Sequence, residues 1–207
     1  MRLCLAHSPV RALLLAGIFL LLTLTACSDF VEVPKPRAYP KVVYPKKEYV
    51  LFDKAYCDFT FEVPKYSVIE QDTLFFEEKA KDDCWFNIKV PELSAQIYCS
   101  YYPVSSRARY DELVADAFTM ASKHNIKASY IEEIPVHRAE ANVHGIIFQI
   151  QGPAASYYQF FVSDSTSNFL RGALYFNTQS RPDSLAPVID FMRADLDHLI
   201  ETIKWGR

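Results

Sequence analysis

Residues 143–176 read VHGIIFQIQGPAASYYQFFVSDSTSNFLRGALYF, and this stretch decides the fold class. It divides into three predicted strands, at 143–151, 156–163 and 168–177, separated by segments rich in Gly, Pro, Ser and Asp that favour turns. The runs IIF, FFV and LYF place apolar residues on both alternating faces of these strands. Because such strands are typical of sheets covered on both faces, we expect a sheet with helices on both sides.

The rest of the chain supplies further strands and two helices. Alternating apolar and polar residues predict strands at 57–63, 86–90 and 95–102, and a less regular pattern predicts one near 127–136.

Apolar residues spaced three and four apart predict a helix over 108–124. A second helix is predicted to end near Ile203, with Asp183 or Ser184 as its N-cap and Pro187 in its first turn. Strands, helix, strands and helix in this order predict an α+β fold, in which an antiparallel β-sheet is flanked by helices on both faces as an α-β-α sandwich.

The N-terminus has the pattern of a lipoprotein signal peptide over residues 1–26. An uncharged apolar run of about 15 residues ends in Leu24-Thr25-Ala26-Cys27, and a membrane-spanning helix needs roughly 20. We therefore predict cleavage before Cys27, although a retained signal anchor is the alternative. Diacylglycerol on the Cys27 thiol and a further acyl chain, such as palmitate, on its amino group would hold the protein to a membrane.

The residues after the cysteine bear on the location and the domain boundary. Ser28 stands where the inner-membrane retention signal of Gram-negative bacteria has Asp, so we expect the outer membrane, at its periplasmic face. Residues 27–50 contain four prolines interleaved with basic residues and have no amphipathic period, which predicts a tether. Residues 51–207 are predicted to form a single globular domain.

Charge and composition exclude some functions. Removing the leader takes away two arginines and no acid, so the formal net charge changes from −3 to −5. Proteins that bind nucleic acid usually carry a basic patch, which an acidic chain of this kind lacks. The chain has five glycines and neither a GxGxxG nor a GxxxxGK[ST] motif, so no phosphate-binding loop and no cofactor are expected.

Three cysteines remain in the mature chain besides Cys27, in an oxidising compartment. Cys99 lies in an apolar alternation that is typical of a buried free thiol, which makes Cys57 and Cys84 the first candidates for a disulfide and leaves its formation open. The spacing of the cysteines and histidines contains no zinc motif. No metal site is therefore expected.

No catalytic residue is predicted, because each candidate has a simpler structural explanation. Residues 163–166 (SDST) offer hydroxyls and a carboxylate, but such residues are typical of a hairpin turn. Asp197 and Glu201 share a helix face off the apolar stripe, where solvated charges are expected. Arg171 lies in an apolar strand, which favours an ion pair or an edge position over the alternative of ligand binding. The four histidines of the mature chain, His124, His137, His144 and His198, are scattered in sequence.

Several short segments, taken in order, resemble the gliding-motility lipoprotein GldD family of Bacteroidota. They are 35–40 (KPRAYP), 57–62 (CDFTFE), 84–85 (CW), 123–124 (KH) with 127–128 (KA), 159–165 (QFFVSDS) and 171–176 (RGALYF). The chain departs from the family at Gly152-Pro153, where the family often has Gly-Asn, and at Asn168, where it often has His. Cys57 and Cys84 match the family's cysteine pair, so the resemblance favours their bridge.

The resemblance implies an outer-membrane or periplasmic lipoprotein that is required for gliding and linked to type IX protein secretion. It implies no enzyme activity, and its partners would be other gliding or secretion lipoproteins. The order of elements also resembles PsbP-type sandwiches, which bears on the fold alone. The alternative function is a periplasmic module that binds a glycan or peptide, suggested by the many tyrosines and by Trp85, which we expect to be exposed. A hydrolase using residues 163–166 is a third and weaker alternative.

Overall fold

The computed structural model describes residues 41–75, 78–79, 82–178 and 181–206. The predicted leader, the predicted lipidation site Cys27 and the predicted tether up to residue 40 lie outside these ranges. The chain divides into two units, Met1–Ala38 and Tyr39–Arg207, and all described residues belong to the second. Among them, no helix is both long enough and apolar enough to cross a membrane.

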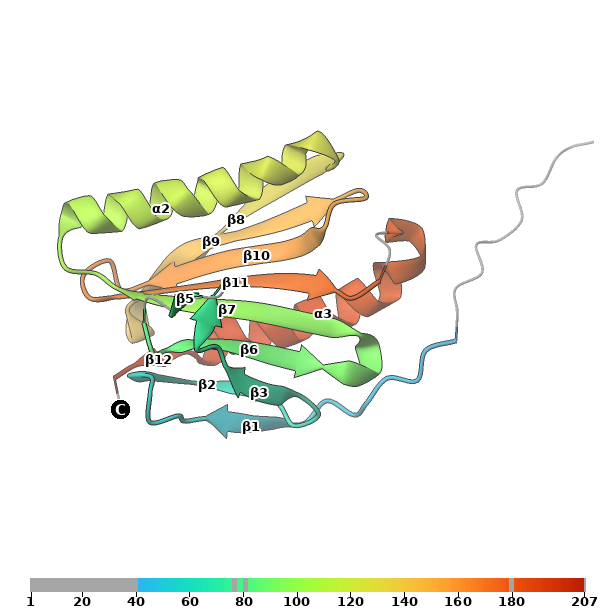
Figure 1. Cartoon of the computed structure of the whole chain (residues 1–207), viewed down its shortest axis with the longest axis horizontal. Helices are drawn as coiled ribbons and strands as arrows, with labels where there is room; N and C mark the ends of the chain where they lie inside the picture. The colour runs from blue at the N-terminus through green and yellow to red at the C-terminus, as the bar shows by residue number, and fades with distance from the viewer. Residues whose placement is uncertain (1–40, 76–77, 80–81, 179–180, 207) are drawn as a thin grey trace, which may run out of the picture. The chain divides into compact units, whose positions relative to one another are not determined.

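A seven-stranded antiparallel sheet forms the centre of the domain, with strand order β3-β6-β7-β11-β10-β9-β8 (Figure 1). Its strands are β3 (Val68–Gln71), β6 (Trp85–Val90), β7 (Ala95–Pro103), β8 (Tyr130–Arg138), β9 (Val143–Gln151), β10 (Ser156–Ser163) and β11 (Asn168–Phe176). The three strands predicted from residues 143–177 are neighbours in this sheet, since short turns connect each to the next.

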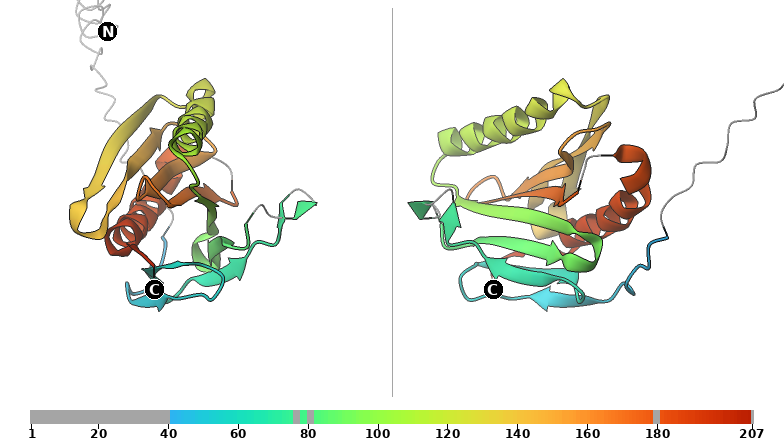
Figure 2. Two further views of the ribbon diagram at one scale, coloured as in Figure 1. Left: turned by 90° about the vertical axis from the view of Figure 1, so that its left-hand side faces the viewer. Right: turned by 45° about the vertical axis from the view of Figure 1, so that its right-hand side comes forward.

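Helices α2 (Arg107–Ser122) and α3 (Pro182–Thr202) cover opposite faces of the large sheet (Figures 1 and 2). Every residue of β10 is buried. Phe160 belongs to the apolar cluster that contains the buried side chains of α3, whereas the adjacent Phe161 belongs to the cluster that contains those of α2. The predicted α-β-α sandwich is therefore confirmed.

A second, three-stranded sheet lies beside the core cluster of α3. It consists of β1 (Tyr49–Phe52), β2 (Phe59–Pro64) and β12 (Lys204–Trp205), in the order β1-β2-β12. Phe52 stacks on Phe61 at 4.5 Å between ring centroids and also contacts Phe86 of β6 at 4.7 Å, so aromatic packing joins the two sheets. The strand predicted at 57–63 thus exists as β2, in a sheet that also contains the C-terminal strand. A short pair, β4 (Leu74–Phe75) and β5 (Glu78–Lys79), forms a third sheet.

Several predicted boundaries differ from the structure. The predicted start of the domain at residue 51 falls inside β1. Helix α2 ends at Ser122, where a 3-10 turn, η2 (Lys123–Ile126), replaces its predicted last residues. Helix α3 begins at Pro182 after the N-cap residue Arg181, so neither Asp183 nor Ser184 is the cap, and Pro187 lies beyond the first turn. A proline at the start of the helix explains the earlier beginning, because its fixed φ suits the first turn.

Gly172 of β11 allows close packing against Phe160 of β10. A Cβ at this position would lie 2.2 Å from the Cε1 atom of Phe160, whose ring is fully buried. We expect Gly172→Ala to lower the free energy of unfolding by about 1–3 kcal/mol, because overpacking forces the neighbouring ring to move. Thermal melting of the mature protein checks this, with an expected fall of roughly 2–4 °C per kcal/mol. An unchanged melting temperature would show that the ring has room to move.

Candidate functional site

The polar turn at residues 163–166 is held together by its own side chains. The Asp164 Oδ1 atom accepts hydrogen bonds from the backbone N–H groups of Thr166, Ser167 and Asn168, at 2.9, 2.7 and 2.9 Å. The Ser163 hydroxyl donates to the Asn168 carbonyl and accepts from the Ser165 N–H. These contacts use the hydroxyl and the carboxylate within the hairpin between β10 and β11, as expected of a turn and not of a hydrolytic site.

Asp164 makes this turn sensitive to acid. Burial alone would raise the pKa of Asp164, but hydrogen bonds from the N–H groups of Ser167, Asn168 and Thr166 hold it below its usual value. A carboxyl whose pKa is lower in the folded state stabilises the protein above its unfolded pKa, and this contribution is lost as the pH falls.

We therefore expect Asp164→Ala to reduce the acid sensitivity of the fold. Unfolding in urea at pH 7 and again near pH 3 measures the effect, which should be destabilising at pH 7 and smaller at pH 3. An equal loss at both pH values would contradict a role for the ionised carboxylate.

The acidic residues of α3 are placed differently from the prediction. Glu201 is exposed, as expected of a solvated charge, but Asp197 is half-buried and accepts a hydrogen bond from the Tyr158 hydroxyl at 2.6 Å. Burial and the nearby Asp197 both raise the pKa of Tyr158, so its hydroxyl remains a donor. The most buried acid of the helix is Asp195, at 2% exposure, which was not singled out from the sequence.

Asp195 accepts three hydrogen bonds from residues far away in the sequence. Its Oδ1 atom lies 2.5 Å from the Lys47 ammonium and 2.8 Å from the Tyr49 hydroxyl, and its Oδ2 atom accepts from the Tyr66 hydroxyl. Burial and the Asp195 carboxylate raise the pKa of both tyrosines, which keeps them protonated as donors. We call Asp195 with these three donors the Asp195 clasp.

The clasp fixes the chain just before β1, in a region that was predicted to be tether. The Lys47 ammonium also donates to the Phe191 carbonyl at 2.9 Å and lies 3.9 Å from the centre of the Phe191 ring. The Tyr44 ring lies 4.7 Å from the same ring. At least from Tyr44 onward, the segment is therefore part of the domain.

A second contact ties the small sheet to α3. The Glu62 carboxylate lies 2.6 Å from Nε2 of His198, and the Tyr49 ring stacks on the His198 ring at 3.8 Å between centroids. The Thr202 hydroxyl accepts from the Glu62 N–H at 2.9 Å. His198 thus packs against Tyr49 and pairs with Glu62, which gives a structural role to one of the four histidines of the mature chain.

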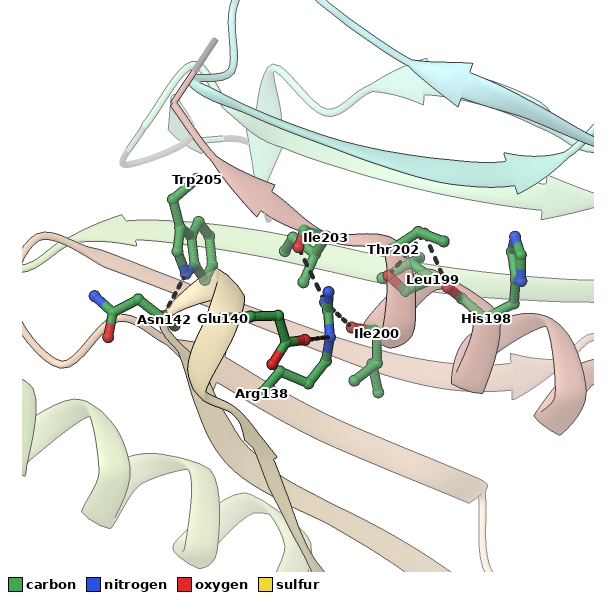
Figure 3. A network of polar contacts seen from close by, with 9 residues as sticks. All are labelled: Arg138, Glu140, Asn142, His198, Leu199, Ile200, Thr202, Ile203 and Trp205. Atoms are coloured by element: carbon green, nitrogen blue, oxygen red, sulfur yellow. Dashed lines mark hydrogen bonds and ion pairs between the residues drawn. The ribbon is translucent and has the colours of Figure 1, made fainter.

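The hairpin between β8 and β9 is braced against the end of α3 (Figure 3). The Arg138 guanidinium donates to the carbonyls of Ile200 and Ile203 at 3.0 and 3.1 Å, which satisfies backbone groups that a helix end leaves open. The Trp205 indole N–H donates to the Asn142 carbonyl at 3.1 Å. The turn itself is a 3-10 segment, η3 (Ala139–Ala141). Both sides of this turn are therefore anchored.

The cysteines are arranged as one bridge and one free thiol. Cys57 and Cys84 form a disulfide with a Cα–Cα distance of 5.0 Å and a sequence separation of 27 residues. It links the segment before β2 to the start of β6, and so joins the small sheet to the large one. Cys99 is buried and free, and burial raises the pKa of its thiol.

Two expectations about single residues are wrong. Trp85 is only 5% exposed, and its indole N–H donates to the Tyr101 carbonyl at 2.9 Å. Arg171 is not at an edge, because β11 lies between β7 and β10, and it makes no ion pair with a described carboxylate. Its guanidinium instead lies 5.7 Å from the centre of the Tyr102 ring. The cation is therefore stabilised by an aromatic ring at a half-exposed position.

A shallow groove of about 600 Å³ lies between the C-terminal half of α2, the turn η2 and the edge strand β8. Three aromatic residues line it, Phe118, Tyr130 and Phe148, together with polar residues that include Asn125 and Glu133. Tyr130 is 58% exposed, so this side of the domain offers an aromatic surface to a partner or ligand. Across the described ranges, no group of three or more potential metal ligands occurs.

The family model of the gliding motility lipoprotein GldD matches residues 29–205. The chain belongs to the GldD family. This match covers almost the whole predicted mature chain, and it shows a lipoprotein of a family associated with gliding motility. The resemblance noted from short segments is thereby confirmed.

The other comparisons add little to this assignment. No match to a curated protein was found. A similar solved structure is the solution structure of cyanobacterial PsbP (CyanoP) from Synechocystis sp. PCC 6803, with a TM-score of 0.43 and 6% sequence identity, covering 78% of this chain and 94% of that chain.

Proposed function

We propose that the protein is an accessory lipoprotein of gliding motility and type IX protein secretion, and that it acts by contact, supporting the assembly or stability of other machinery components. The observation that carries this proposal is the family match over residues 29–205. In this proposal the protein performs no enzymatic step, and its partners are other gliding or secretion lipoproteins of the envelope.

We further propose that acyl chains on Cys27 hold the protein to the outer membrane, at its periplasmic face. The lipobox before Cys27 and the membership of a lipoprotein family support the anchor, and Ser28 supports the outer membrane. Two or more acyl chains give stable attachment where one chain would not.

The geometry of the domain is consistent with a protein that works by contact. The Asp195 clasp ties α3 to β1, and the Arg138 guanidinium ties β8 to the end of α3, so a partner would meet a surface whose elements are joined by tertiary contacts. Tyr130 lines the groove beside α2, and Ile126, at 89% exposure, follows the groove residue Asn125 in η2, so both present apolar area to solvent on this side. Apolar and aromatic residues of this kind are enriched at protein interfaces, which makes the groove side the candidate contact surface.

Complementation of a deletion strain tests the proposal. The wild-type gene should restore gliding, secretion and the steady-state levels of the other gliding lipoproteins, and Cys27→Ala should restore none of them even when the protein is stable. Ala26→Ser, which keeps a small residue in the lipobox, is the matched control and should behave as wild type. Full activity of Cys27→Ala would contradict the role of the anchor, and unchanged levels of the other lipoproteins in the deletion strain would contradict a stabilising role.

A periplasmic ligand-binding module is the second candidate, because the groove combines aromatic rings with polar groups. Titration of the mature protein with oligosaccharides and short peptides, followed by NMR amide shifts, tests it. Saturable shifts confined to the groove and lost in Tyr130→Ala would favour this function. The absence of saturable shifts would exclude the tested ligands from the groove.

A further inference from the structure

Two of the histidines that are scattered in sequence meet in the β8–β9 hairpin. His137 and His144 are directly opposite each other in the antiparallel register, and their Nδ1 atoms are 3.0 Å apart. His137 is exposed and His144 is half-buried. The pair is therefore accessible from solvent.

The contact restricts the protonation of both rings. A neutral imidazole has one N–H and one nitrogen lone pair, so a direct hydrogen bond requires one ring to carry its proton on Nδ1 and the other on Nε2. If both rings carry the proton on Nε2, two lone pairs face each other. A shared cation satisfies both lone pairs at once.

The distance fits such a cation. Zinc–nitrogen bonds are about 2.0–2.1 Å, so two nitrogens on one tetrahedral ion are roughly 3.3 Å apart. This requires a change of only a few tenths of an ångström from the observed 3.0 Å. The ring centroids lie 4.8 Å apart. Two rings that faced each other in a straight line would be separated by the distance between the nitrogens plus the two ring radii, which is more than this. The rings therefore meet at an angle, as two ligands of one ion must.

The hairpin holds the pair in place before any ion binds. Arg138, next to His137, is fixed to the end of α3, and Asn142, two residues before His144, accepts from the Trp205 indole (Figure 3). The Arg138 guanidinium reaches α3 on the other face of the sheet, so its charge is directed away from the histidines. Preorganised ligands bind with a smaller entropic cost.

We propose that His137 and His144 form a two-nitrogen binding site for a divalent transition-metal ion, Zn²⁺, Ni²⁺ or Cu²⁺. Imidazole nitrogen suits these ions, and Cu²⁺ binds most tightly of the three. Ser163 lies opposite His144 in the register of β9 and β10, and its hydroxyl is used within the turn. Among the described residues, the two histidines are therefore the ligands that the chain supplies here. Water, or a donor from a docked protein, completes the coordination.

Calorimetric titration of the full-length lipoprotein in detergent, without a histidine tag, tests the site with ZnCl₂ and NiCl₂. We expect one ion per chain, and at least tenfold weaker binding in His137→Asn and in His144→Asn. The matched control is His124→Asn, which removes a histidine that contacts Gln159 at 2.8 Å elsewhere in the domain, and it should bind as wild type. Binding should weaken as the pH falls, because protons compete for the same nitrogens.

Electron paramagnetic resonance of the wild-type protein with one equivalent of Cu²⁺ gives an independent readout that needs no variant. Hyperfine coupling to two imidazole nitrogens is expected. The absence of binding up to about 1 mM metal, coupling to fewer than two imidazoles, or equal binding in the double variant His137→Asn/His144→Asn would each overturn the proposal.

Discussion

Replacing Asp195 with asparagine is expected to lower the free energy of unfolding by about 2–3 kcal/mol, because it removes the charge of a buried carboxylate that accepts three hydrogen bonds and pairs with the partly exposed Lys47. Lys47 would lose its carboxylate, and the amide nitrogen of the new side chain would replace one of the two acceptor oxygens. It would then face either the Tyr66 hydroxyl or the donors Lys47 and Tyr49. Urea-induced unfolding of the mature protein measures the loss.

Asp190→Asn is the matched control, because Asp190 lies on the same helix and pairs with Arg193 at 3.2 Å on the surface. Asp190→Asn should lower the free energy of unfolding by less than about 1 kcal/mol, as is usual for exposed ion pairs. Hydrogen exchange adds a local readout, in which Asp195→Asn should expose the amides of residues 47–52 and Asp190→Asn should not. Equal effects of the two variants would show that the Asp195 clasp does not hold residues 47–52 in place.

Removing the disulfide is expected to cost about 3 kcal/mol, since Cys57 and Cys84 close a loop of 27 residues. The double variant Cys57→Ser/Cys84→Ser should melt at a lower temperature than wild type, and a reducing agent should lower the melting temperature of wild type but not that of the variant.

Counting thiols in denaturant tests the same point without mutation. With Cys27 acylated and Cys57 bridged to Cys84, only Cys99 should react. Three reactive thiols in the mature protein would contradict the bridge.

The elements that the sequence predicts best are those whose pattern is local. The strands that became β9, β10 and β11 are dense apolar runs between turn residues, and neighbouring strands joined by short turns tend to pair. The sheet β1-β2-β12 was not predictable in this way, because it joins residues 49–64 to residues 204–205. Nothing in a local pattern indicates a pairing across so much of the chain.

The contacts of Asp195, Trp85 and the His137–His144 pair were harder to predict. Asp195 lies three residues after Met192, on the buried face of α3, and a charge at such a position is a signal that could have revealed the clasp. Trp85 was expected to be exposed because it alternates with the core residues of β6, but the other face of the sheet is also covered there. The His137–His144 pair depends on the register of a hairpin, which the length of the predicted strands did not determine.

The most direct test of the central claim, a lipid-anchored protein that acts by contact, is photo-crosslinking in intact cells. A crosslinkable residue is placed at Ile126, which follows the groove residue Asn125 in η2, and at Leu51 and Tyr98 elsewhere on the exposed surface, in wild type and in Cys27→Ala. We predict that wild type captures other gliding or secretion lipoproteins most strongly from Ile126, and that Cys27→Ala captures none. Failure of wild type to capture any envelope protein from all three positions, or equal capture by Cys27→Ala, would contradict the account.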